Sequence, residues 1–489
     1  MTFIKPPFIV ALLILMFSQT IGLHAQQQVH GLVIDFATRE PMPFVSIAVV
    51  GSTFGTVSNQ NGEFTLNPGN FNSSDSIAFH YLGYETLKIK ITGLKDGMIV
   101  EIKEKPVSLR TIAIIGNPFT PEQLIRKALE RKKENYPVVA QKREVFKRSN
   151  SAFYINAFDL SLKKSDIPEV DKNLVREMVD SIPRYSRSYS DHLYTLYTIP
   201  ADSGKTKNKV EGIKNVVLKE DNGGGLENIS KIITDLFIHK KDDKTFWKYK
   251  TGLFSFKESH VKVSTPGSDS ANMKNLSPLY FLDGDHGWNK DFIQKTNRYQ
   301  YQNMGIISTG GEDAYAISFR GKGGADYQGM IYISIESYAI LRMEYSLRER
   351  KKDNGIDLLG ISYSLEKDDG LLSYEKEQSG YFLKYSMRAS STRYGVDRPF
   401  EIIRKEKRPI LNKKINEAAF RMNLQGNQET CNETLVVYRE GSSEGKFKTI
   451  MERGVKPERI TSYSDTIWKG YSIIEPTRQM KEYRAKIRN

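Results

Sequence analysis

Ser443 lies in Gly-Ser-Ser-Glu-Gly (residues 441–445), which has the G-x-S-x-G spacing that many serine hydrolases use to present a nucleophile. Such a nucleophile follows a strand and precedes a helix, and its histidine comes later in the chain. The strand is present in ETLVVYRE, but KFKTIMER alternates like a second strand, and His286 is the last histidine. We therefore interpret residues 441–445 as a hairpin turn and expect Ser443→Ala to leave folding and any activity unchanged.

The run Gly204-Lys205-Thr206 resembles the end of a phosphate-binding loop. That loop needs an earlier glycine at position 199, which is Ile199 here, and it needs a strand-to-helix turn. PADSGKTKNKVEG is a polar segment, and we interpret it as a surface loop without a nucleotide.

DGDHGWNKD (283–291) gathers three aspartates around His286 and Trp288. Oxygen ligands at alternating positions could hold calcium, but a bidentate glutamate is lacking at the expected distance, and one histidine does not make a zinc site. We interpret the segment as a turn-rich loop. Glu375 and Glu377 are expected on an exposed strand face. The sequence thus predicts no catalytic, cofactor-binding or metal-binding residue, and a protein that is not an enzyme.

The N-terminus has the pattern of a secretory signal. Lys5 precedes an apolar run from Phe8 to Phe17, and the segment ends in small and polar residues at Ala25. The run is too short to span a bilayer comfortably, so we predict a signal peptide over residues 1–25 and no transmembrane segment in the mature chain. Cys431 is the only cysteine, which excludes an internal disulfide and a lipid anchor near the cleavage point. The protein is therefore expected in the periplasm or at the outer membrane, and not as a lipoprotein.

The composition indicates folded, exported protein. Of the 489 residues, 39% are hydrophobic and 27% are charged, which excludes a disordered chain and a polytopic membrane protein. The net charge of +14 would suit nucleic acid, acidic lipid or acidic glycan. Because an exported protein rarely meets nucleic acid, we predict no nucleic-acid partner. The basic run RKEKRPILNKK (404–414) is interpreted as a solvated strand edge and loop.

Residues 29–104 predict a β-sandwich of six or seven short strands. Val45, Ile47 and Val49 alternate along one strand, and Asn61-Gly62 is a strong hairpin signal. This segment resembles the carboxypeptidase-regulatory-like domain, a transthyretin-like sandwich. The residues that carry the resemblance are Gly31, Val33, Pro41, Pro43, Val45, Ile47, Gly51, Gly55, Thr56, Asn61, Gly62, Phe64, Leu66, Leu82, Gly83 and Tyr84.

The resemblance implies an accessory module of envelope proteins and does not imply a peptidase. A zinc carboxypeptidase needs a His-x-x-Glu pair, and none of the seven histidines has a glutamate three residues on. His80 lies inside a strand pattern and is interpreted as structural. The sandwich is assigned to residues 26–106 and a connector with a helix to residues 107–140.

That helix is predicted over 121–135, because Thr120 and Gln123 have capping-box spacing and Leu124, Ile125, Ala128 and Leu129 form an apolar stripe. Residues 141–489 predict an antiparallel β-rich domain with short strands, half-barrel-like and covered by this helix. Tyr315, Ile317 and Phe319 share one face, and GISYSLEKDDGLLSYEKE predicts a hairpin that turns at Asp369-Gly370.

An insertion of loops and helices is predicted at 163–245, with helices near 171–181 and in LENISKIITDLFIHKK. The segments EQLIRKALERKKENYP, SPLYFL, GMIYISIESYAI and IWKGYSIIEP resemble a group of secreted envelope proteins in which the sandwich precedes a domain of undefined function. The fold class is therefore mainly β.

The function that we expect is binding or adaptor work in the cell envelope, with a partner protein, a glycan or a lipid as ligand. Two other functions are compatible with the sequence. One is a hydrolase or peptidase built from scattered acidic residues, and the other is an accessory subunit of an outer-membrane transporter.

Overall fold

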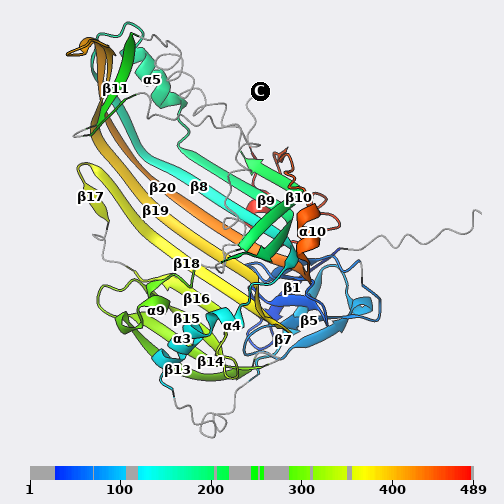
Figure 1. The fold of residues 1–489 in the computed structure, drawn as a ribbon. Coiled ribbons are helices and arrows are strands. Elements are labelled where there is room, and N and C mark those ends of the chain that lie inside the picture. The colour runs from blue at the N-terminus through cyan, green and yellow to red at the C-terminus, as the bar shows by residue number, and fades with distance from the viewer. Residues whose placement is uncertain are drawn as a thin grey trace, which may run out of the picture.

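The computed structural model describes residues 28–69, 71–105, 119–202, 206–219, 244–251, 254–257, 286–308, 312–349 and 355–485. A small N-terminal sandwich lies against one end of a large, curved sheet (Figure 1). Of the described residues, 57% are strand and 12% are helix, which confirms the predicted mainly β class. Within the described ranges, no helix has the length and apolar character needed to cross a bilayer.

The sandwich pairs a three-stranded sheet, in the order β4-β1-β7, with a four-stranded sheet, in the order β3-β2-β5-β6. Val45, Ile47 and Val49 are buried between the sheets, as their alternation predicts. The hairpin predicted at Asn61-Gly62 is wrong, because this turn joins β3 to β4, which belong to different sheets and do not pair. Gly62 has φ +77°, and a Cβ there would lie 2.7 Å from the Val33 carbonyl oxygen, so the turn needs glycine. The elements are β1 (Val29–Asp35), β2 (Ser46–Val49), β3 (Gly55–Val57), β4 (Glu63–Leu66), β5 (Ser76–His80), β6 (Leu87–Lys90), η1 (Ile91–Gly93) and β7 (Met98–Ile102).

The large sheet has the strand order β13-β14-β15-β16-β18-β19-β20-β8-β9-β10-β21. Three further strands pair outside this order: β11 pairs with β19, β12 pairs with β11, and β17 pairs with β18. Every pairing is antiparallel except that of β10 with β21. Its strands are β8 (Gln141–Ser165), β9 (Tyr185–Pro200), β10 (Thr206–Lys219), β11 (Thr245–Thr251), β12 (Phe254–Lys257), β13 (Tyr299–Ser308), β14 (Asp313–Gly321), β15 (Tyr327–Ser334), β16 (Ile340–Leu347), β17 (Ile356–Leu358), β18 (Ile361–Glu377), β19 (Gly380–Glu406), β20 (Lys413–Gly441) and β21 (Glu458–Ile460).

Three expectations about these strands are wrong. The strands are not short, since β20 has 29 residues. Asp369-Gly370 makes no hairpin turn, because β18 runs straight through it. Gly370 opposes Tyr345, and a Cβ at Gly370 would lie 2.3 Å from that ring, so the glycine makes room for a cross-strand aromatic. The expected surface loop PADSGKTKNKVEG is strand from Thr206 on, because its residues pair with β9.

The helices are α3 (Pro121–Glu130), α4 (Lys132–Asn135), α5 (Lys172–Ser181), α9 (Asp291–Gln294), η5 (Thr296–Arg298), α10 (Glu444–Thr449) and α11 (Arg478–Glu482). Thr120 and Gln123 form the predicted capping box at α3, and Leu124, Ile125 and Ala128 are fully buried. Asp171 caps α5, where a helix is predicted. The signal peptide, SPLYFL and the helix predicted in LENISKIITDLFIHKK lie outside the described residues.

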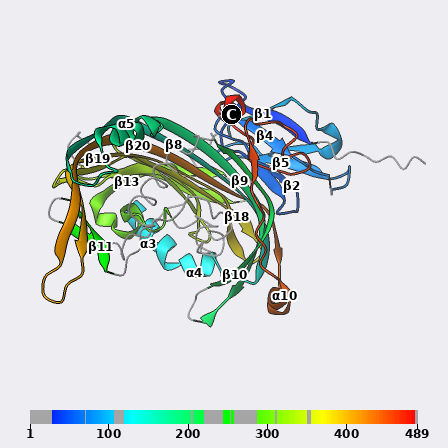
Figure 2. The same cartoon turned by 90° about the horizontal axis from the view of Figure 1, so that it is seen from above.

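The large sheet has two faces that pack against different parts of the chain. Leu372 belongs to the core under α3, and its neighbour Leu371 belongs to the core shared with the sandwich. We call the face under α3 the inner face and the other the outer face. The sheet arches around α3 and α4, with the sandwich on the outside (Figure 2).

A C-terminal segment, Ile467–Glu475, lies between the sandwich and the outer face, and we call it the strap. Trp468, Ile473 and Ile474 are buried in the core that it shares with both. The Thr56 hydroxyl donates to the Ile473 carbonyl at 2.8 Å, and Arg148 donates to the Ile474 carbonyl at 2.9 Å. The strap therefore joins the sandwich to β8.

Candidate functional site

Ser443 is the N-cap of α10. Its Oγ accepts a hydrogen bond from the Lys446 amide at 3.2 Å, and Glu444 occupies the first helical turn. The prediction of a hairpin turn with a second strand is therefore wrong, because this cap and Glu444 favour a helix. A strand, a serine and a helix follow one another here, as they do around a hydrolase nucleophile, but the Ser443 hydroxyl caps the N-terminus of α10.

The four histidines among the described residues make hydrogen bonds elsewhere. Their partners are Asp96 for His30, Thr86 for His80, Ser190 for His192 and Tyr345 for His286. No serine–histidine pair of a hydrolase therefore forms at Ser443 within the described ranges.

The described part of DGDHGWNKD begins at His286 and forms a wall of the inner core. The His286 ring is 2.6 Å from the Tyr345 hydroxyl, and Trp288 donates to Tyr374 at 2.8 Å. Asp291 accepts from Arg298 at 3.1 Å. Among the described residues, no three His, Cys, Asp or Glu side chains lie close enough together to hold a metal ion. Asp283 and Asp285 lie outside the described residues, as do Gly204 and Lys205.

Lys290 from the same segment joins a buried polar network on the inner face. It forms an ion pair with Asp368, which also accepts from Tyr327 at 2.8 Å and from Arg388 at 2.9 Å. Burial raises the pKa of Asp368, but the hydrogen bonds from these three side chains outweigh it and hold the pKa below its ordinary value. The sequence did not single out this carboxylate.

Glu375 and Glu377 do not lie on an exposed face, so that expectation is wrong. The Ser46 hydroxyl of the sandwich donates to Glu375 at 2.8 Å, and Arg439 donates to Glu377 at 2.6 Å. Both carboxylates face groups that were distant in the sequence, and the local pattern could not show these partners.

A cleft of about 410 Å³ lies between the sandwich and the large sheet, beside Glu375. Arg342 is buried there with its guanidinium 4.9 Å from the Tyr81 ring, and it pairs with Glu344 at 2.5 Å. Burial lowers the pKa of His80, and the charge of Glu375 acts in the opposite sense. These polar groups satisfy one another across the domain interface, which favours a structural role for the cleft.

The inner face carries a second feature, which we call the apolar rows. In an antiparallel sheet, directly opposed residues share a face. Leu372 of β18 lies on the inner face and opposes Ser386 of β19, so Ser386 lies on the inner face too. Tyr394 is an even number of residues from Ser386 along β19, so Tyr394 and the opposed Tyr363 of β18 also lie on the inner face. The rows are Tyr363, Tyr394 and Ile155; Ile361, Val396, Leu424 and Phe158; Met422 and Leu160; and Phe400, Phe420 and Leu162.

Most of these side chains are incompletely covered. Tyr363 is 50% and Ile361 43% exposed, and the others are half-buried except Phe420, which is 7% exposed. Leu174 and Val175 of α5 pack on the rows nearest the tip of the sheet, together with Trp247. The rows between α5 and the polar network thus present apolar surface on four neighbouring strands.

The outer face opposite these rows is polar. Asp397 opposes Asn423, which opposes Asp159, and Arg421 lies beside them, 2.9 Å from Asp397. This part of the sheet is therefore amphipathic across its thickness. Towards α3 the inner face also becomes polar, with hydrogen bonds between Ser390 and Thr430 at 2.7 Å and between Ser149 and Asn432 at 2.8 Å.

Comparisons with known proteins add to this description. The chain is 8% identical to a LolA superfamily protein, NE2245, from Nitrosomonas europaea, over 63% of this chain and 91% of that one, with a TM-score of 0.15. It is 7% identical to a chain of the MucA/MucB complex of Pseudomonas aeruginosa, over 66% and 99%, also with a TM-score of 0.15. At these TM-scores the likeness supports no conclusion.

No curated protein sequence matches the chain. Residues 29–114 match the family model of the CarboxypepD_reg-like domain. The seven-stranded sandwich, with the expected glycines at its turns, agrees with that match. The N-terminal part of this protein is therefore a carboxypeptidase-regulatory-like domain.

Proposed function

We propose that this protein is an exported, non-enzymatic protein of the cell envelope that binds an acyl-chain amphiphile on the apolar rows of the inner face. The single observation that supports this function is the alignment of partly exposed apolar side chains on four neighbouring strands. Burying apolar surface stabilises a complex by about 0.8 kcal/mol per methylene group. A flexible acyl chain suits such an apolar strip, which the buried Arg398, opposite Met422, interrupts on β19.

The polar network beside the rows suits the other end of an amphiphile. Asp368, Arg388, Ser390 and Thr430 lie on the same face as Tyr394, since all are inner-face positions of β18, β19 and β20. A ligand with an apolar tail and a polar head would match this change of polarity along the sheet.

Export and the absence of catalysis are parts of the same proposal. The N-terminal pattern supports export. Ser443 as a helix cap, and Glu375 and Glu377 as partners of Ser46 and Arg439, support a binding role without catalysis. Among the described residues, no specific observation favours the hydrolase or the transporter subunit.

The test is displacement of a fluorescent fatty-acid analogue from the mature protein by phospholipids and fatty acids. Ile361→Gln with Tyr363→Gln should weaken binding about tenfold, which corresponds to about 1.4 kcal/mol. About half of each side chain is already exposed to solvent, so the fold should tolerate the changes.

A matched control is Phe36→Gln with Ile99→Gln. These side chains of the sandwich are 48% and 59% exposed and lie on a different domain. If the control weakens binding as much as the inner-face variant does, or if the unmodified protein binds no acyl ligand, the proposal is wrong.

A further inference from the structure

The β19–β20 hairpin ends in an apolar tip that none of the described residues covers. Residues 407–415 are all exposed, and Ile410 and Leu411 expose 93% and 80% of their surface. Ile and Leu are among the side chains that folded proteins most often bury completely. Pro409 precedes them, and the Asn412 side chain accepts from the Arg408 amide at 3.3 Å, which closes the turn.

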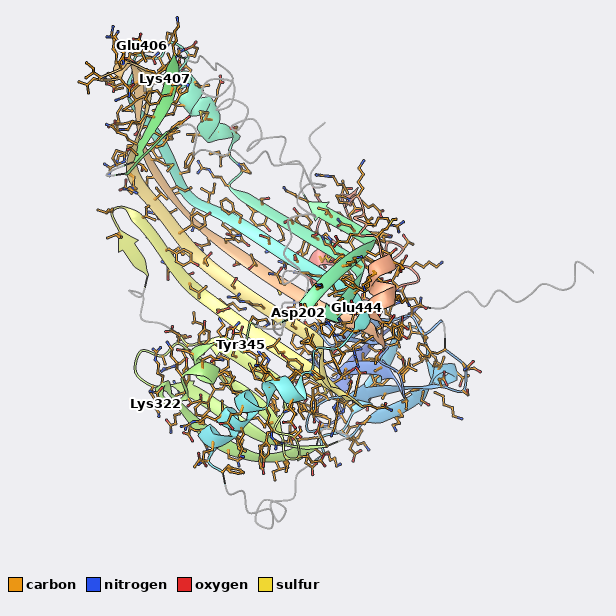
Figure 3. The ribbon with its side chains drawn as sticks, viewed as in Figure 1. Asp202, Lys322, Tyr345, Glu406, Lys407 and Glu444 are labelled. Atoms are coloured by element: carbon orange, nitrogen blue, oxygen red, sulfur yellow. The ribbon has the colours of Figure 1, made fainter. Side chains whose placement is uncertain are left out.

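Basic residues surround this tip. Residues 404–414 contain six Lys and Arg and one acidic residue, Glu406, which pairs with Arg408 at 2.9 Å. Lys414 pairs with Glu417 at 2.9 Å. Glu406 and Lys407 lie at the end of the sheet furthest from the sandwich (Figure 3). A protruding pair of apolar side chains within a basic collar is complementary to an anionic lipid surface, because the side chains can enter the headgroup region while the cations remain at the phosphates.

We infer that the β19–β20 tip docks the protein on an anionic lipid bilayer, with Ile410 and Leu411 inserted and the basic residues of 404–414 at the headgroups. The hairpin register supports this role, since pairing continues to Glu406 and Lys413 and so holds the six-residue tip rigidly on the sheet. Phe400 and Phe420, the last of the apolar rows, lie on the same two strands. Docking would thus bring the apolar rows close to the membrane, but it does not depend on ligand binding there.

The experiment introduces a fluorescent reporter at the tip. The three native tryptophans, Trp247, Trp288 and Trp468, are at most 5% exposed, so a new surface tryptophan would dominate any response to lipid. Ile410→Trp in the full chain should show a blue shift, and quenching by brominated lipid, with vesicles that contain phosphatidylglycerol. Met451→Trp is the control, because Met451 is 86% exposed but lies outside the tip, and it should respond to neither.

Sedimentation with vesicles tests the chemistry of the contact. Ile410→Ser with Leu411→Ser should weaken binding to phosphatidylglycerol vesicles about tenfold, and Lys407→Gln with Lys413→Gln should have a similar effect. Met451→Ser should bind as the unmodified protein does. Higher salt should also weaken binding, since screening shortens electrostatic range from about 10 Å at 0.1 M to about 3 Å at 1 M.

Three results would overturn the inference. The first is that the protein binds vesicles of phosphatidylcholine alone as strongly as vesicles that contain phosphatidylglycerol. The second is that both tip variants bind as the unmodified protein does. The third is that the emission spectrum of the Ile410→Trp variant responds to self-association but not to lipid. Failure of the acyl-displacement experiment would leave this inference standing, because the two assays use different variants and different ligands.

Discussion

Ser443 shows how one hydroxyl can match a catalytic spacing and yet have a local structural role. Its Oγ accepts from the Lys446 amide, which would otherwise have no partner in the first turn of α10. The sequence argued against a nucleophile because no histidine follows, and that stays a prediction, whereas the hairpin turn expected here is wrong because a helix follows Ser443. A six-residue helix contributes too little periodicity to outweigh an alternating pattern.

We expect Ser443→Ala to destabilise α10 by about 1 kcal/mol, which corrects the neutral effect expected from the sequence. Hydrogen exchange of the α10 amides should become about fivefold faster, while any binding activity stays unchanged. Ser442→Ala is the matched control, because the Ser442 hydroxyl is buried without a hydrogen-bond partner among the described residues. Equal exchange in the two variants would contradict the cap.

His80 gives a pH-dependent prediction. Burial lowers its pKa in the folded protein, Arg342 adds to this effect and Glu375 opposes it. In the unfolded chain the pKa is about 6.5, so the unfolded state binds more protons below that pH. The contribution of neutral His80 to stability is therefore complete above about pH 6.5 and decreases as the pH falls below it.

We expect His80→Gln to reduce the loss of stability between about pH 7.5 and about pH 5.5, measured as the shift of the urea midpoint. Glutamine retains polar atoms for the cleft without titrating. If the variant and the unmodified protein lose the same stability over this range, His80 does not contribute to the acid sensitivity.

At the scale of elements, local sequence signals specify some helices and strands, and tertiary contacts specify others. The helix α3 could be predicted from its capping box and apolar stripe, because residues within a few positions of one another specify a helix. The 17-residue strand β18 could not be predicted, because Asp369-Gly370 by itself is a good turn signal and only the Tyr345 ring on β16 explains the glycine.

This explanation predicts the effect of a methyl group at position 370. Gly370→Ala should destabilise the protein by about 1–3 kcal/mol, because the Tyr345 ring must move. Gly324→Ala should be nearly neutral, since nothing lies within 4 Å of a Cβ there. Urea unfolding measures both, and equal midpoints would contradict a packing role for Gly370.

At the scale of the whole molecule, the strap connects the two parts of the structure. Trp468 is 1% exposed and packs edge-on against Phe146 of β8, with ring centroids 5.4 Å apart. Gln28 at the start of the sandwich donates to the Tyr471 carbonyl at 3.0 Å. The sandwich therefore contacts the large sheet partly through residues more than 400 positions away in the chain.

Trp468→Ala should cost about 3–5 kcal/mol of stability and loosen the sandwich from the sheet. Small-angle scattering should then show a larger radius of gyration, and Met451→Ala should leave both measurements unchanged. A compact variant with unchanged stability would show that the strap is dispensable for docking.

The sequence by itself determined the carboxypeptidase-regulatory-like sandwich, the mainly β class and the helices α3 and α5, because caps, turns and alternation act between near neighbours. Only the tertiary structure decided the length of the strands, the strap, the partners of Glu375 and Asp368, and the alignment of the apolar rows. Those features depend on strand register between residues far apart in the chain, and no local pattern contains that register.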